Sequence, residues 1–338
     1  MKVLSGAPLV LIFHALICVP SYISAQNIQD VTQAHSVSPS NSTWKSTKAE
    51  HVYGFPDIKP NKKGTLTLDA DALTFSGKSG NTSIRRSSLT SASAGNQRVE
   101  MWGIGGRILR MTIPDGGGLA AAAFMHHRVD MLTVEFNDDR GAAHSAVFFL
   151  PANEATRALQ NFALAPVPAQ PRMASENACQ NAPAEANSVL LVSPSWTQAE
   201  VPAAYRSLVY EHMIDRLRLA KGVGHVYRDG ENNSQTACPQ YMIHISIATF
   251  KEGSSVKRAF MGPVGMFVGT TQIRFDVTYT DASGRMNVQE QIKATIRGES
   301  ESTNVADHVA KSLAKQYGNV LKNANKSSSA KNTINATS

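Results

Sequence analysis

Residues 273–296 read IRFDVTYTDASGRMNVQEQIKATI, and this stretch supports the firmest structural prediction in the chain. Its first half alternates polar residues with apolar ones, namely Ile273, Phe275, Val277 and Tyr279. A period of two residues is typical of a half-buried β-strand. The four residues 281–284 have turn chemistry, and a second alternating run follows from Met286. We therefore expect a long β-hairpin with one apolar face.

The hairpin lies in the second half of the chain, for which the pattern predicts the order β-α-β-β-β-β-α. An apolar run at 189–192 indicates a buried strand, and a helix is expected from Pro202 to a stop at Gly222. Strands are expected at 224–227 and 241–250, before the hairpin. A final helix is indicated by apolar residues three and four apart: Val305, Val309, Leu313, Tyr317 and Val320. These elements predict an α+β domain, an α/β sandwich with a mixed sheet and two helices, over residues 188–322.

This half resembles a group of uncharacterised bacterial envelope domains that are similar to the amino-terminal domain of the translocation protein TolB. The likeness is carried by the glycine-spaced segment 262–269, the strand 273–281, the turn to Gly284 and the helix beginning at Asn304. The resemblance implies a bacterial envelope protein. The family has no assigned catalytic residues, so it implies none here.

The first half, residues 49–164, is expected to be mainly β. Short strands are predicted at 65–68, 72–75, 82–85, 88–92, 98–102, 107–113, 129–136 and 145–150. A helix is predicted from Asn153, its cap, to Phe162. Antiparallel strands followed by a single helix resemble a bacterial pleckstrin-homology-like domain. That resemblance implies a β-barrel closed by its C-terminal helix.

The remaining segments lack the pattern of a folded domain. Residues 1–25 have the charge and apolar run of a secretory signal, too short to cross a bilayer as a helix. Residues 26–48 are expected to be a flexible leader, 165–187 a proline-rich linker, and 323–338 a disordered tail. We expect an exported bacterial protein, periplasmic or extracellular, with no transmembrane segment in the mature chain.

Two cysteines, Cys179 and Cys238, remain once the predicted signal is removed. In an oxidising compartment they suggest one disulfide, worth about 4 kcal/mol in the chain-entropy model. The alternative is two free thiols, because spacing alone does not show that the residues meet. Neither lies in a zinc-binding pattern.

The formal net charge is +7, and the basic residues are scattered. Nucleic-acid binding would require a basic stripe interleaved with aromatic residues, which the sequence lacks. We expect no nucleic-acid partner. An anionic envelope surface is compatible with the charge.

A glycine-rich segment at 116–118 is followed by small and apolar residues, and we treat this region as the candidate binding surface. Its members are Leu119, Phe124, Met125, His126 and His127. If exposed, the segment would suit a lipid or a small apolar ligand. The alternative is that it fills the core.

No catalytic constellation is found in the sequence. The glycines at 103–106 precede a strand pattern instead of the helix that a dinucleotide site needs. His126 and His127 would point to opposite faces of a strand, which disfavours a shared metal ion, and His144 lies on a neighbouring strand. We predict a non-enzymatic adaptor or scaffold that binds another envelope protein, without a cofactor or metal. The alternatives are a binding module for a lipid or small apolar ligand near 116–130, and an enzyme that uses these histidines.

Overall fold

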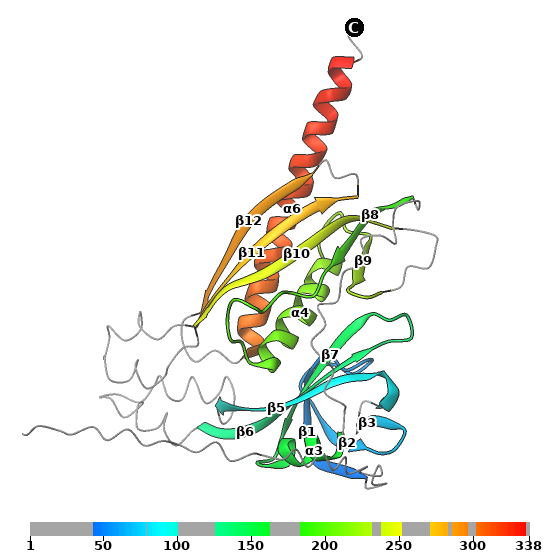
Figure 1. The fold of residues 1–338 in the computed structure, drawn as a ribbon, viewed down its shortest axis with the longest axis vertical. Helices are drawn as coiled ribbons and strands as arrows, with labels where there is room; N and C mark the ends of the chain where they lie inside the picture. Colours follow the sequence, from blue (N-terminus) through cyan, green and yellow to red (C-terminus); the bar gives the residue numbers. More distant parts are fainter. Residues whose placement is uncertain are drawn as a thin grey trace, which may run out of the picture. The chain divides into compact units, whose positions relative to one another are not determined.

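The structure is a computed structural model that describes residues 43–78, 80–100, 126–162, 183–231, 238–251, 271–282, 286–296 and 302–335. These residues form a seven-stranded sheet, a five-stranded sheet and three α-helices (Figure 1). The expected chain of two parts, one mainly β and one α+β, is therefore confirmed at the level of two sheets with helices.

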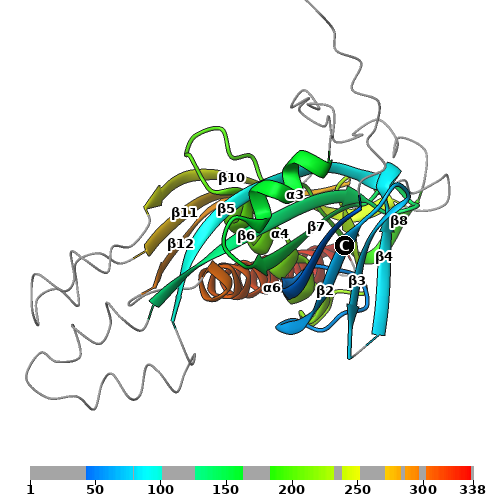
Figure 2. The same ribbon diagram turned by 90° about the horizontal axis from the view of Figure 1, so that it is seen from below.

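The first sheet has the strand order β4-β3-β2-β1-β7-β6-β5. Its strands are β1 (Trp44–Tyr53), β2 (Lys62–Leu68), β3 (Ala72–Gly77), β4 (Gly80–Arg85), β5 (Leu89–Glu100), β6 (His126–Asn137) and β7 (Ala143–Leu150). A short 3₁₀ turn, η1 (Arg86–Ser88), separates β4 from β5. Helix α3 (Glu154–Phe162) follows β7 and lies beside β5 and β6 (Figure 2). It buries Ala155, Ala158 and Phe162 against the core of this sheet.

Strand β1 was not predicted: residues 44–48 were expected in the flexible leader, and no strand was expected at 49–53. The structure places it in the middle of the sheet, antiparallel to both β2 and β7. Trp44, Ser46 and Ala49 are buried, with a register shift between Ser46 and Ala49. The polar composition of this strand hid an alternation that a bulge also interrupts. Another difference is that β5 is one continuous strand where two were expected.

The first sheet is open within the described residues, since no strand pairing joins the edge strands β4 and β5. The closed barrel that the pleckstrin-homology resemblance implied is therefore not supported. The strand expected at 107–113 lies outside the described residues.

The second sheet has the order β12-β11-β10-β8-β9, with parallel pairings of β8 to β9 and β10 and antiparallel pairings elsewhere. Its elements are β8 (Ala184–Leu191), α4 (Ala203–Arg218), β9 (His225–Arg228), β10 (Cys238–Lys251), β11 (Thr271–Asp281), β12 (Asn287–Ile296) and α6 (Ser302–Asn335). The predicted order and the mixed sheet are confirmed. Strand β8 begins inside the segment expected to be linker.

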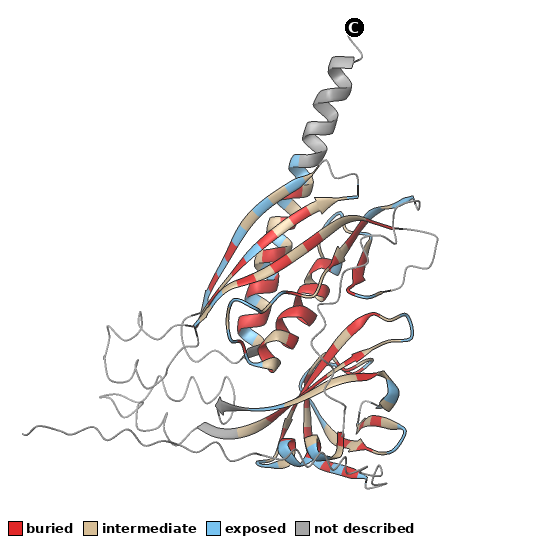
Figure 3. Cartoon of the chain, viewed as in Figure 1, coloured by how far each residue is buried: buried red, intermediate tan, exposed pale blue. Residues whose placement is uncertain are grey.

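The predicted hairpin is β11 and β12, paired without interruption from Thr271 with Ile296 to Thr280 with Asn287. Buried and more exposed residues alternate along both strands (Figure 3). The buried face packs on the helices, with Ile273, Phe275, Val277 and Tyr279 all at 1% exposure or less. The two-residue period of the sequence therefore reflects burial of one face of the hairpin, as expected.

Helix α6 buries Val305, Val309, Leu313, Tyr317 and Val320, the stripe expected from the sequence. The helix continues to Asn335, through residues that were expected to be a disordered tail. No helix among the described residues is long and apolar enough to span a membrane.

One of the two core clusters crosses from one sheet to the other. It combines the apolar residues of the second sheet, α4 and α6 with Val52, Met131 and Val147 of the first sheet. Hydrogen bonds and an ion pair between buried polar residues lie beside this apolar patch.

Candidate functional site

Helix α4 supplies most of this polar cluster because it is buried on nearly all sides. Its apolar residues pack against the second sheet, among them Leu208, Val209 and Met213, each at 1% exposure or less. Polar residues on the same helix are buried too, namely Ser207, Glu211 and His212. These three positions of α4 are shielded from water, although Arg218 at the end of the helix is exposed, so their polar groups need partners in the protein.

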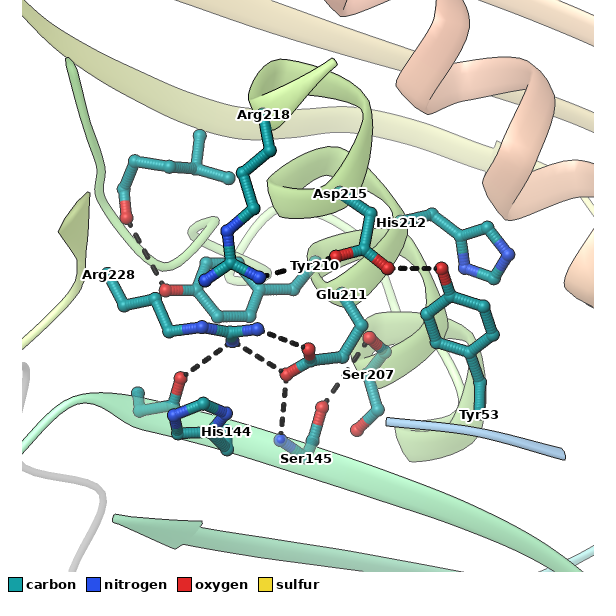
Figure 4. Close-up of polar contacts among 12 residues, drawn as sticks. Tyr53, His144, Ser145, Ser207, Tyr210, Glu211, His212, Asp215, Arg218 and Arg228 are labelled. Carbon is teal, nitrogen blue, oxygen red and sulfur yellow. Dashed lines mark hydrogen bonds and ion pairs between the residues drawn. The ribbon is translucent and has the colours of Figure 1, made fainter. Parts of the chain in front are cut away.

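Glu211 and Arg228 form a buried ion pair at the centre of the cluster (Figure 4). Arg228, at the end of β9, donates from Nη1 to Glu211 Oε1 at 2.9 Å and from Nη2 to Glu211 Oε2 at 2.7 Å. Both side chains are 5% exposed. Burial opposes the charge of Arg228, but the Glu211 carboxylate outweighs it and raises the pKa of the guanidinium. Arg228 therefore keeps its charge.

The ion pair also holds the backbone of β7 in the first sheet. The Ser145 N–H donates to Glu211 Oε1 at 2.9 Å, and Arg228 Nη1 donates to the Ala143 carbonyl at 3.0 Å. A backbone bond from Ala143 N to Asp229 O, at 2.9 Å, lies next to them. Three hydrogen bonds thus join β7 to α4 and to the end of β9.

Tyr210 supports Arg228 from one side. Its ring centroid lies 5.8 Å from the guanidinium carbon, within the range of a cation–π contact. Its hydroxyl accepts a hydrogen bond from the Asp229 N–H at 3.0 Å. Burial raises the pKa of Tyr210, so the hydroxyl keeps its proton.

Two glycines let the loops approach beside the ion pair. Gly141 has φ +81° and Gly230 has φ +74°, both in the left-handed region. A Cβ atom built on either glycine would lie 2.9 Å from the carbonyl oxygen of the other. A side chain at either position would push the loops apart.

A second polar contact joins β1 to the end of α4. The Tyr53 hydroxyl donates to Asp215 Oδ2 at 2.5 Å, and its ring stacks on His212 at a centroid distance of 3.9 Å. Burial and the hydrogen bond to Asp215 raise the pKa of Tyr53. Burial lowers the pKa of His212, whose Nδ1 lies 2.8 Å from the Leu208 carbonyl. A neutral ring stacked on tyrosine fits this half-apolar position.

The chemistry available to this cluster is largely committed to structure. Glu211 accepts from two guanidinium nitrogens and one backbone N–H. Arg228 Nε and Ser207 Oγ are buried without a hydrogen-bond partner. Within the described residues, no group of three or more His, Cys, Asp or Glu side chains could hold a metal ion. These contacts join the two sheets, and we call the group the polar connector: Tyr53, Ser145, Tyr210, Glu211, His212, Asp215 and Arg228.

The structure does not test the candidate binding surface. Leu119, Phe124 and Met125 lie outside the described residues, and only the backbone of His126 and His127 is described, in β6. The proposed ligand site near 116–130 stays a prediction.

His144, considered above with the histidines of a hypothetical enzyme, lies on β7 next to the cluster. Its ring stacks on Phe136 with centroids 5.3 Å apart. Its Nε2 is 3.4 Å from Asp138 Oδ2, without the geometry of a hydrogen bond. Burial, and then the charge of Arg228, lower the pKa of His144.

Cys238, at the start of β10, is disulfide-bonded. Cys179 lies outside the described residues, so the pairing of these two cysteines stays a prediction.

Sequence reasoning did not identify Glu211, Arg228 or Tyr53. A signal was present for Glu211, which lies between the apolar positions 208–209 and 213–214 of a helix. Arg228 follows the apolar residues of a short strand. When each of two elements carries a charged residue among its core positions, a buried ion pair is indicated. Which residues are partners cannot be identified without the tertiary fold.

No protein-family model matches the chain, and no curated protein does. Among solved structures, a PelC dodecamer from Paraburkholderia phytofirmans is similar over 39% of this chain and 91% of its own, at 20% identity and a TM-score of 0.29. A crystal structure of an uncharacterized protein is similar over 42% of this chain and 94% of its own, at 8% identity and a TM-score of 0.25. Likenesses at such TM-scores support no conclusion about function.

Proposed function

We propose that the protein is a non-enzymatic adaptor of the bacterial cell envelope that binds a partner protein along the free edge of β12. The observation that carries this proposal is the shape of that edge. Strand β12 has ten residues and is fully paired with β11 on one side, and no described strand pairs with its other side. Unpaired backbone groups along a long strand are a template for an added strand.

The other described edges are less suitable for strand addition. Strand β9 has four residues and β4 has six, with Gly80 at its start. Strand β5 is long, but it carries register shifts near its beginning. By contrast, β12 is regular and contains neither proline nor glycine.

The polar connector supports an adaptor because it fixes one sheet against the other through named contacts. An adaptor that binds at a sheet edge gains affinity when the edge is held in place before binding. The disulfide at Cys238 supports export, since such bonds persist in oxidising compartments. We also propose that residues 49–164 are related to pleckstrin-homology-like domains and residues 188–322 to the TolB amino-terminal domain. Both relationships rest on the sequence resemblances.

The test is photocrosslinking in cells, with benzoylphenylalanine placed at single positions. Gln289 and Gln291 are exposed on β12, and Lys48 is exposed on the central strand β1 as a matched control. We expect one or two dominant protein adducts from the β12 positions and none of these from Lys48. The double variant Gln289→Lys/Gln291→Lys, crosslinked from Asn287, should lose the adduct, because edge lysines oppose strand addition. The same adducts from all positions, or none from β12, would refute the proposal.

A further inference from the structure

The outer face of α6 carries a row of basic side chains. The row consists of His308, Lys311, Lys315 and Lys322, all exposed. Residues spaced by three, four and seven lie on one side of a helix. The buried residues of α6 occupy the opposite side, against the second sheet and α4. This row is therefore the solvent face of the helix.

Acidic residues do not balance this row. Residues 302–335 contain five lysines and a single carboxylate, Asp307. Asp307 is shared, since its Oδ1 lies 2.6 Å from Arg216 Nη2 and its Oδ2 lies 2.7 Å from Lys311 Nζ. These cations lower the pKa of Asp307 although its burial acts in the opposite direction. Lys315 and Lys322 carry further positive charge, outside the ion-paired group formed by Asp307, Arg216 and Lys311.

We propose that this face of α6 docks the protein onto an anionic lipid surface. The row from residue 308 to 322 is straight and spans about 21 Å at the rise of an α-helix. A flat, negatively charged surface can contact all of it at once. Each lysine near such a surface contributes about 1 kcal/mol, and the attraction falls off within a Debye length.

The side chains of the row favour lipid over a protein or a nucleic acid. Protein interfaces are enriched in aromatic side chains and arginine, and neither type occurs in the row. Single-stranded nucleic acids are bound by stacking on aromatic rings, which the row also lacks. The other exposed residues described on α6 are Asn304, Asn319 and Asn323, so this face has no exposed apolar side chain to insert into a bilayer. Docking would be peripheral and salt-sensitive. This inference does not depend on the proposed function.

The test is co-sedimentation of the purified chain with vesicles of two compositions. One is phosphatidylcholine alone, and the other is phosphatidylcholine with phosphatidylglycerol in a three-to-one mixture. The test variant is Lys315→Glu/Lys322→Glu, which leaves the Lys311–Asp307 pair intact. The control variant is Lys62→Glu/Lys63→Glu, on β2, which changes the net charge equally. Circular dichroism checks that both variants fold.

We expect the wild type to sediment with the anionic vesicles alone, and high salt to release it. The α6 variant should bind at least roughly 30-fold more weakly, the effect of losing two lysines near the surface, and the β2 control should bind like the wild type. Equal losses in both variants would show a response to net charge and overturn the proposal. Failure of the wild type to bind, or binding to duplex DNA or polyglutamate but not to vesicles, would also overturn it. If the α6 variant misfolds, Lys315→Gln/Lys322→Gln against Lys62→Gln/Lys63→Gln gives the same comparison without charge reversal.

Discussion

Replacing Arg228 with methionine should destabilise the protein strongly, by leaving the Glu211 carboxylate buried without a counter-charge. The change removes both hydrogen bonds to Glu211 and the one to the Ala143 carbonyl. Because Glu211 is 5% exposed, water does not replace them. Removing one partner of a buried ion pair costs about 3–5 kcal/mol. We expect a loss of that size in the free energy of unfolding, measured by urea titration followed by circular dichroism.

A second variant separates the cost of the unpaired buried charge from the cost of the lost packing. In Arg228→Met/Glu211→Gln the amide still accepts a hydrogen bond from the Ser145 N–H but carries no charge. This double variant should recover at least about 1.5 kcal/mol of the loss, because an unpaired buried charge costs more than a buried amide. The control is Arg218→Met, which breaks a half-exposed ion pair with Asp215 on the same helix, and it should cost less than about 1 kcal/mol. The reasoning would be refuted if Arg228→Met cost no more than Arg218→Met, or if the double variant were no more stable than Arg228→Met.

Three further predictions concern the same connector. Tyr53→Phe keeps the stack on His212 but loses the bond to Asp215, so chemical denaturation should show a loss of about 1 kcal/mol. Gly230→Ala meets both a positive φ and a carbonyl at 2.9 Å, whereas Gly222→Ala, at φ +88° with nothing within 4 Å, meets the φ cost alone; the first should lower the melting temperature more. Burial lowers the pKa of His212 in the folded state. The neutral His212 ring therefore contributes its full stabilisation above the pKa of the unfolded state, about 6.5, and this stabilisation is lost as the pH falls through the lower pKa of the folded state. His212→Phe should weaken this acid dependence in melting experiments, and an unchanged pH profile would refute the assignment.

The second sheet could be predicted from the sequence because its strands alternate apolar and polar residues. Alternation along residues 273–280 reports burial of one face, and that burial is what the structure shows. Strand β1 was missed for a matching reason. Its inward positions include Ser46, at 0% exposure, and a register shift breaks the period. A period-two pattern fails where a small polar residue takes a core position.

The connector could not be predicted, because its partners come from α4, β7, β9 and β1. A single apolar stripe on α4 predicts one buried face and one solvated face. The structure also buries Glu211 and His212, on the side of α4 that faces the first sheet. The apolar period of a helix indicates which side packs against one neighbouring layer. Helix α4 packs against two layers, so its second buried side leaves no apolar pattern.

The strand-addition and lipid-docking proposals use adjacent elements but different atoms. Strand β12 would offer its backbone edge, whereas α6 would offer side chains on the face opposite to its buried residues. The two interactions therefore need not compete. The variant Lys315→Glu/Lys322→Glu should release the protein from anionic vesicles and leave the crosslinks from Gln291 in place. If it abolished those crosslinks while the fold was retained, partner binding at β12 would depend on the basic face of α6.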